Sequence, residues 1–182
     1  IDNFVPGAGA TATTESEIDR WILSELNQLV ADVDDALDGY NPTEAGRKID
    51  GFVDGLSNWY VRRSGRRFWR RENDADKLSA YNTLYQCLVS LVKLMAPLAP
   101  FMAEELYQSL VHSVSPDGPE SVHLADFPVV DESKIDKKLS DSHRLAMKVS
   151  SMGRAARSKA GIKVRQPLSV NYIGYGSDYD KK

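Results

Sequence analysis

The chain has 182 residues, 42% of them hydrophobic and 27% charged, which is the composition of a folded globular domain rather than of a disordered segment. Its single cysteine, Cys87, excludes a disulfide framework within the chain and a multi-thiolate metal site, and no apolar run reaches the ~18 residues of a membrane span. The formal net charge of −3, taken as an average, argues against a nucleic-acid partner.

The chain begins with a turn-prone stretch that precedes an amphipathic helix. Pro, Gly and small residues fill 6–14, so we predict that 1–16 is a linker. Apolar residues then recur at steps of three or four, which predicts a helix over 17–37. Ser16 and Asp19 are spaced as the partners of a capping box at its start, and Gly39 suits the left-handed conformation at its end.

A second helix is predicted to begin at Asn41-Pro42, because Asn is a strong N-cap and Pro fits the first helical turn. Its apolar stripe runs to Trp59 or Tyr60, for which core packing is favoured, and the stripe fails at Arg62. Gly65 is a candidate for breaking this helix.

The remaining chain alternates predicted helices with short connections. A loop over 115–130 is expected to hold a short extended piece at 121–124, and Gly161 is expected to end the last helix. Alternating apolar residues after Gly161 are typical of extended chain. The predicted helices of this part span 76–95, 101–114 and 134–159.

Together these elements predict an all-α fold, an antiparallel helical bundle with a short extended C-terminal segment. We divide the chain into a linker (1–16), a helical domain (17–160) and the start of a truncated C-terminal extension (161–182). Because the first residue is Ile and no leader follows it, we expect the chain to be a segment of a longer protein.

The net charge conceals two strongly basic segments. Residues 62–71 contain six arginines and no acid, and residues 144–165 contain seven bases and no acid. The flanking segments 1–61 and 72–143 carry net charges of −9 and −7. Because like charges repel unless anions neutralise them, each basic segment indicates an anionic partner, either phosphate or carboxylate.

No catalytic, cofactor-binding or metal-binding constellation is found. His112, His123 and His143 are scattered without a pair at ligand spacing, and Cys87 lies beside apolar helical positions, which favours a packed core thiol. The Pro-Gly-Ala-Gly-Ala run at 6–10 lacks the preceding strand of a phosphate-binding loop. We therefore predict no catalytic, cofactor or metal residues in this chain.

The first basic segment interleaves arginine with aromatic residues, as surfaces that bind single-stranded RNA do. A guanidinium binds phosphate through two hydrogen bonds, and an aromatic ring offers an unpaired base a stacking surface worth roughly 1–3 kcal/mol. The alternative is ion pairing with carboxylates such as those of Asp32, Asp34, Asp35 and Asp38, and composition does not decide between the two. The candidate RNA contacts here are Arg62, Arg63, Arg66, Arg67, Trp69, Arg70 and Arg71.

The second basic segment supplies further candidates. Arg154 and Arg157 lie three residues apart and so share a helix face, and Lys163 and Arg165 alternate onto one face of the predicted extended piece. No acid occurs between Ser142 and Ser177, which disfavours a surface of simple salt bridges. These four basic residues are the second set of predicted RNA contacts.

Four stretches resemble the isoleucyl-tRNA synthetases, in that family's order. The run Leu56-Ser-Asn-Trp-Tyr-Val-Arg-Arg-Ser-Gly-Arg-Arg-Phe-Trp69 is similar to the helix that marks their anticodon-binding region, and Asp19-Arg-Trp-Ile-Leu-Ser24 is similar to its entry. The run Leu94-Met-Ala-Pro-Leu-Ala-Pro-Phe-Met-Ala-Glu-Glu-Leu-Tyr107 resembles a hairpin shared by class I synthetases for aliphatic amino acids. Gly161-Ile-Lys-Val-Arg-Gln-Pro-Leu168 resembles the exit from the bundle, and Gly65 departs from the family's usual basic residue.

This resemblance implies a domain that docks the anticodon stem and loop of tRNA(Ile). The parent enzyme of this domain would be an isoleucine–tRNA ligase, which uses ATP and Mg. The family's catalytic signatures, His-Ile-Gly-His and Lys-Met-Ser-Lys-Ser, are absent here, so the resemblance places catalysis in another part of the parent chain. It also implies a cytoplasmic location, a catalytic domain as intramolecular partner, and no membrane. The alternative is a structural docking domain whose arginines form interdomain salt bridges.

Overall fold

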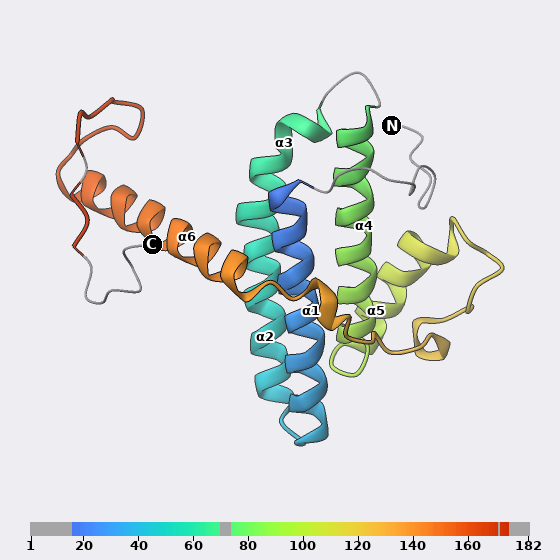
Figure 1. Cartoon of the computed structure of the whole chain (residues 1–182). Helices are drawn as coiled ribbons and strands as arrows, with labels where there is room; N and C mark the ends of the chain where they lie inside the picture. Colours follow the sequence, from blue (N-terminus) through green and yellow to red (C-terminus); the bar gives the residue numbers. More distant parts are fainter. Residues whose placement is uncertain (1–15, 70–73, 171, 175–182) are drawn as a thin grey trace. The chain divides into compact units, whose positions relative to one another are not determined.

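The computed structural model describes residues 16–69, 74–170 and 172–174, which are drawn in colour in Figure 1. The chain divides into two compact units, Ile1–Asp136 and Lys137–Lys182. The all-α prediction is confirmed, and the described residues contain no strand. The division falls between Asp136 and Lys137, so the last helix groups with the residues that follow it rather than with 17–136. Apart from Ser16, the predicted linker lies outside the described residues.

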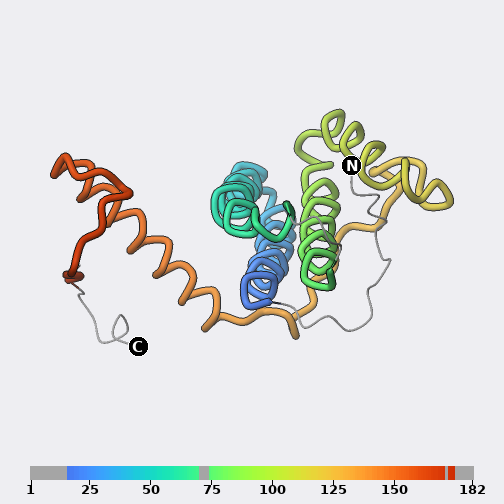
Figure 2. The backbone as a smooth tube through the Cα atoms, turned by 90° about the horizontal axis from the view of Figure 1, so that it is seen from above, coloured from blue at the N-terminus to red at the C-terminus, as the bar shows by residue number. Residues whose placement is uncertain are grey.

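The first unit is a bundle in which α1 (Glu17–Asp38) packs against both α2 (Pro42–Gly55) and α4 (Ala75–Met95). In Figure 1, α1 and α4 run in the same direction and α2 runs in the opposite direction. Figure 2 shows α1 beside both α2 and α4. Their apolar faces form the main core, which contains the buried side chains of Trp21, Ile22, Leu26, Val33, Ala45, Ile49, Phe52, Leu91 and Leu94.

Local signals fix both ends of α1. The predicted capping box is confirmed, because Ser16 Oγ accepts the Asp19 amide at 3.3 Å and the Asp19 carboxylate accepts the Ser16 amide at 3.4 Å. The helix ends at Asp38 with Gly39 as its C-cap, as predicted, but the left-handed conformation expected at Gly39 occurs one residue later. Tyr40 takes the left-handed conformation at φ 53°, whereas Gly39 has φ −76°. The amides of Tyr40 and Asn41 then bond the carbonyls of Leu37 and Ala36, which is the Schellman pattern.

We expect Tyr40→Gly to raise the free energy of unfolding by up to about 1 kcal/mol, since glycine avoids the strain of a left-handed L-residue. The matched control is Gly161→Ala, because Gly161 ends α6 with φ +67° and an added Cβ there is strained. Urea denaturation followed by circular dichroism would measure both variants. A loss of stability in Tyr40→Gly would show that the exposed phenol ring contributes more than its backbone costs.

The basic helix continues α2 without a break. A π-helical turn, η1 (Leu56–Val61), joins α2 to α3 (Arg62–Phe68), so Gly65 lies inside a helix and does not end it. The buried stripe advances by four residues from Phe52 to Leu56, Tyr60 and Ser64. A step of four overshoots one α-helical turn by about 40°, and the wider π turn compensates for this drift so that the stripe keeps facing the bundle.

The polypeptide after α4 forms a small second core. Here α5 (Pro100–Tyr107) continues into a π turn, η2 (Gln108–His112), and the predicted extended piece at 121–124 is instead a 3-10 turn, η3 (Val122–Leu124). The Glu104 carboxylate holds this turn, because it accepts the Val122 amide at 3.0 Å and the Ser121 hydroxyl at 2.8 Å. The buried members of this core are Val92, Ala103, Tyr107 and Val122.

Polar side chains of α1 hold the end of the first unit. The Asn27 amide oxygen accepts the Asp131 amide at 2.9 Å, and the Ser24 hydroxyl accepts the Asp136 amide at 2.8 Å. These two bonds bracket a short 3-10 turn, η4 (Glu132–Lys134), so the segment is fixed along α1.

The second unit contains α6 (Lys137–Lys159), a helix in which no side chain is buried. As predicted, Gly161 ends it, with the left-handed backbone that this residue type favours. The predicted extended piece after Gly161 is not a strand, since the residues around Lys163 to Gln166 form a turn. In neither unit does a described helix combine the length and hydrophobicity needed to cross a membrane.

Candidate nucleic-acid interface

An exposed basic and aromatic surface lies along η1 and α3. Arg62, Arg63 and Arg66 are exposed, and none of them forms an ion pair within the part of the chain that the structure describes. Helical steps of three and four place them beside Trp59 and Trp69. We call these five residues the α3 face: Trp59, Arg62, Arg63, Arg66 and Trp69.

The two tryptophans of the α3 face are held differently. The Arg63 guanidinium lies 4.8 Å from the centroid of the half-buried Trp59 ring, within the range of a cation–π contact. Trp69 is 84% exposed, and a Cβ placed at Gly65 would lie 3.9 Å from its indole, so the ring rests beside the helix backbone. The α3 face therefore presents three cations and one open aromatic ring.

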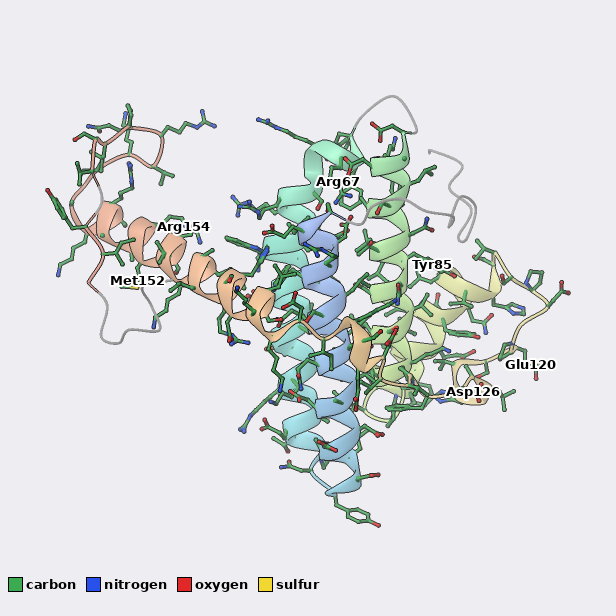
Figure 3. All side chains as sticks on the ribbon, viewed as in Figure 1. Arg67, Tyr85, Glu120, Asp126, Met152 and Arg154 are labelled. Atoms are coloured by element: carbon green, nitrogen blue, oxygen red, sulfur yellow. The ribbon has the colours of Figure 1, made fainter. Side chains whose placement is uncertain are left out.

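Arg67 is turned away from this face into the bundle. Its guanidinium donates to both Asp19 oxygens at 2.7 Å, and its Nε donates to Asp76 at 2.9 Å. Only 12% of its side chain is exposed, and Figure 3 shows it between α3 and the start of α4. The structure therefore removes Arg67 from the predicted phosphate contacts, because both edges of its fork are already bound to carboxylates.

Asp19 is the centre of a buried polar network. Besides Arg67, its carboxylate accepts the Tyr60 hydroxyl at 2.8 Å and the Ser79 hydroxyl at 3.2 Å. Burial raises the pKa of Asp19, but the hydrogen bonds from Arg67 and Tyr60 and the charge of Arg67 outweigh burial and hold it below its usual value. One carboxylate thus joins α1, η1, α3 and α4 at the end of the bundle that carries the α3 face.

The alternative drawn from the sequence, in which the arginine block pairs with the acids of 32–38, is not observed for the described arginines, Arg62, Arg63, Arg66 and Arg67. Asp32 instead bonds Lys48 at 3.0 Å, near the C-terminal end of α1. At 1.5 Å per residue, the distance along α1 from Asp19 to Asp32 is about 20 Å, which is beyond the reach of an arginine. Negative charge therefore collects at the α1–α2 end of this unit and positive charge at the α3 end.

The second basic segment, like the first, contains both exposed cations and one arginine that bonds other groups of this chain. Arg154, Lys163 and Arg165 are exposed on the second unit and form no ion pair among the described residues, and Figure 3 marks Arg154 on α6. Arg157, by contrast, is half-buried and donates to backbone carbonyls of its own loop. Arg70 and Arg71 lie outside the described residues.

The predicted core thiol, Cys87, is fully buried, and burial raises its pKa to about 12. Over the described ranges, no group of three or more His, Cys, Asp or Glu residues is placed to hold a metal ion.

The partners of Arg67 are not predicted from the sequence. From the sequence, Asp19 is expected to cap α1 and Tyr60 is expected to pack in the core, and neither expectation pairs Asp19 with Arg67. The missed signal is the spacing of Arg67 seven residues after Tyr60, which places both on one helix face.

The sequence comparisons agree with the prediction drawn from the motifs. A family model described as "Anticodon-binding domain of tRNA ligase" matches residues 19–172. The chain belongs to this family. The matched range of this anticodon-binding domain includes the whole α3 face and every described residue of the second basic segment.

The curated relatives of this anticodon-binding domain are much longer proteins. The isoleucine–tRNA ligase of Dehalococcoides mccartyi (strain CBDB1) is 66% identical over 169 residues, which are 93% of this chain and 17% of that protein. The isoleucine–tRNA ligase of Clostridium novyi is 48% identical over 95% of this chain and 17% of its own length. That of Porphyromonas gingivalis is 54% identical over 86% of this chain and 14% of its own length. The chain thus spans about a sixth of these relatives.

Proposed function

We propose that this domain docks the anticodon stem and loop of tRNA(Ile) for an isoleucine–tRNA ligase, and that the α3 face is its principal contact. The observation that carries the proposal is the difference between Arg67 and its neighbours. Arg67 is neutralised inside the bundle, whereas Arg62, Arg63 and Arg66 lie exposed without carboxylate partners among the described residues. Three uncompensated cations beside an exposed indole suit a phosphate backbone with unstacked bases.

The charge distribution of the first unit favours one docking direction. A polyanion is attracted to the α3 end and repelled by the acids near the α1–α2 turn, so encounters with RNA are oriented before contact. Arg154, Lys163 and Arg165 of the second unit supply a further group of cations for the same partner.

The chemistry of the proposed ligase belongs to the rest of the parent chain. In this proposal the cytoplasmic parent enzyme holds ATP and Mg in a catalytic domain of the same chain and esterifies isoleucine to the tRNA. The domain described here binds and orients the tRNA.

The test is tRNA binding by Arg62→Gln/Arg63→Gln/Arg66→Gln at two or more salt concentrations. We expect the triple variant to lose most of its affinity for a tRNA(Ile) transcript, and the log–log salt slope to become shallower by about 2, at ~0.7 for each single-strand phosphate contact. The matched control is Arg47→Gln, which removes an exposed positive charge from α2 and should leave the slope unchanged.

Two results would contradict the proposal. An unchanged affinity in the triple variant would show that the α3 face does not contact the tRNA. If the same variant instead lowered the stability of the whole ligase without changing tRNA affinity, the arginines would form interdomain salt bridges, which is the alternative drawn from the sequence.

A further inference from the structure

The end of α6 is a tightly hydrogen-bonded turn. The Ile162 amide donates to the Arg157 carbonyl at 2.9 Å and the Gly161 amide donates to the Ser158 carbonyl at 3.2 Å, with Gly161 at φ +67°. These two bonds and the left-handed glycine are the Schellman pattern, which directs the chain back along the helix that it has just left.

The side chain of Arg157 extends this turn. Its Nη1 donates to the Lys163 carbonyl at 3.0 Å and to the Gln166 carbonyl at 2.7 Å, and the Val164 carbonyl lies 3.5 Å away. The Gln166 amide closes the turn by donating to the Lys163 carbonyl at 3.0 Å. Arg157 thus binds the returning chain through both its backbone oxygen and its guanidinium. We call residues 163–166 the basic turn.

The basic turn carries two cations that Arg157 does not use. Lys163 and Arg165 are exposed and form no ion pair in the described part of the chain. Asp141 and Asp178 are the nearest acids in sequence on either side, so no carboxylate from this stretch neutralises them. Arg157 holds the carbonyls of Lys163, Val164 and Gln166. The backbone that bears the Lys163 and Arg165 side chains is therefore fixed.

We infer that Arg157 is a positioning residue for RNA: it fixes the basic turn so that Lys163 and Arg165 meet phosphates of the bound tRNA together. This inference rests on the proposed function and changes the role expected for Arg157, which the sequence analysis placed among the direct contacts. A turn that is ordered before binding loses less conformational freedom on binding, so the same two contacts yield a higher affinity.

The experiment uses the 182-residue chain and two measurements. The variants are Arg157→Gln, Lys163→Gln/Arg165→Gln and the combination of all three. Limited trypsin digestion with mass spectrometry reports how often the basic turn opens, through cleavage after Lys163 and Arg165. Binding of a tRNA(Ile) transcript reports affinity. The matched control is Arg144→Gln, which removes an exposed positive charge from the same helix, where it pairs with Asp141.

We expect Arg157→Gln to accelerate cleavage after Lys163 several-fold and to weaken tRNA binding about tenfold. In the Lys163→Gln/Arg165→Gln background, Arg157→Gln should cause no further loss of affinity, because the contacts through which it acts are gone. Arg144→Gln should change neither measurement.

Three outcomes would overturn the inference. An equal loss of affinity from Arg157→Gln in both backgrounds would make Arg157 a direct phosphate contact. Unchanged trypsin cleavage would show that its hydrogen bonds do not hold the turn. If the wild-type chain did not bind tRNA while Arg157→Gln still accelerated cleavage, the proposed function would fail, and the RNA role of Arg157 with it, although the turn would remain anchored as described.

Discussion

Replacing Arg67 with Met is expected to lower the free energy of unfolding by about 3–5 kcal/mol, because it breaks a buried ion pair on one side only. The substitution leaves the Asp19 carboxylate, which is 0% exposed, without the two hydrogen bonds of 2.7 Å that balance its charge. Met has nearly the length of the aliphatic part of Arg, so the loss reports charge and hydrogen bonding more than packing. Urea denaturation at pH 7 measures it, with the m-value as a check that the unfolding remains two-state.

Arg66→Met is the matched control, since Arg66 is the neighbouring residue on the same helix and is exposed. A change within about 0.5 kcal/mol is expected for it. Asp19→Leu/Arg67→Met removes both charges together and should recover part of the stability lost in the single variant. If Arg66→Met and Arg67→Met destabilised the chain equally, the structural distinction between the two arginines would be wrong.

The effect of Arg67→Met also depends on pH. The pKa of Asp19 lies below its ordinary value of 3.8 in the folded chain, so its ion pair stabilises the fold above that pH and stops doing so as the pH falls through the folded pKa. In Arg67→Met the guanidinium is absent, so burial raises the pKa of Asp19 and is opposed only by hydrogen bonds such as those from Tyr60 and Ser16. As the pH falls, the variant regains stability between its raised Asp19 pKa and the ordinary value of 3.8, and the wild type loses stability between 3.8 and its lowered pKa. The stability difference between wild type and variant should therefore narrow across both intervals, and a difference that stayed constant in acid would exclude ionised Asp19 as its source.

Helix ends were predictable because a cap uses residues that are close in sequence. Ser16, Asn41 and Gly161 each mark the end that they were predicted to mark, through hydrogen bonds within a few residues. The π turn at Leu56–Val61 was not predictable in this way, because a π turn is selected by what the helix must face. Here Tyr60 reaches Asp19, which lies 41 residues earlier.

Residue type could not separate the roles of the arginines. Arg66 and Arg67 are adjacent and chemically identical, and only the partner opposite each one decides whether it is exposed or buried. The same holds for Arg154 and Arg157, which share a helix face while only Arg157 has carbonyls of a returning chain within reach. The sequence therefore located both basic surfaces, but it could not show that Arg67 and Arg157 bond acceptors of this chain while Arg66 and Arg154 are exposed.

The extended chain predicted after Gly161 was wrong for a physical reason. The prediction rested on the alternation of Ile162 and Val164 with Lys163 and Arg165. A period of two indicates a strand only where neighbouring strands supply hydrogen bonds. In this chain the Arg157 side chain and the end of α6 supply those partners instead, and the alternating residues form a turn.

Tyr107→Ala is expected to cost about 3–5 kcal/mol, because the ring is 1% exposed and fills the small core between α4, α5 and η3. Two controls separate the contribution of the buried ring from that of its hydroxyl group. Leu106→Ala truncates the exposed neighbouring residue and should cost less than about 1 kcal/mol. Tyr107→Phe removes only the hydroxyl that donates to the Pro119 carbonyl at 3.3 Å and should cost about 0.5–1.5 kcal/mol.

The part of the structure that Tyr107→Ala destabilises is more informative than the amount of stability lost. The small core contains no residue of α1, α2 or α3, so Tyr107→Ala should open 100–125 locally while the main bundle keeps its amide protection in hydrogen exchange. Under conditions in which the bundle stays folded, tRNA affinity should be unchanged, because the α3 face is held by Asp19 and Arg67 at the other end of α4. Equal loss of protection in α1 and in α5 would show instead that the two cores unfold as one unit, and that the α3 face depends on both.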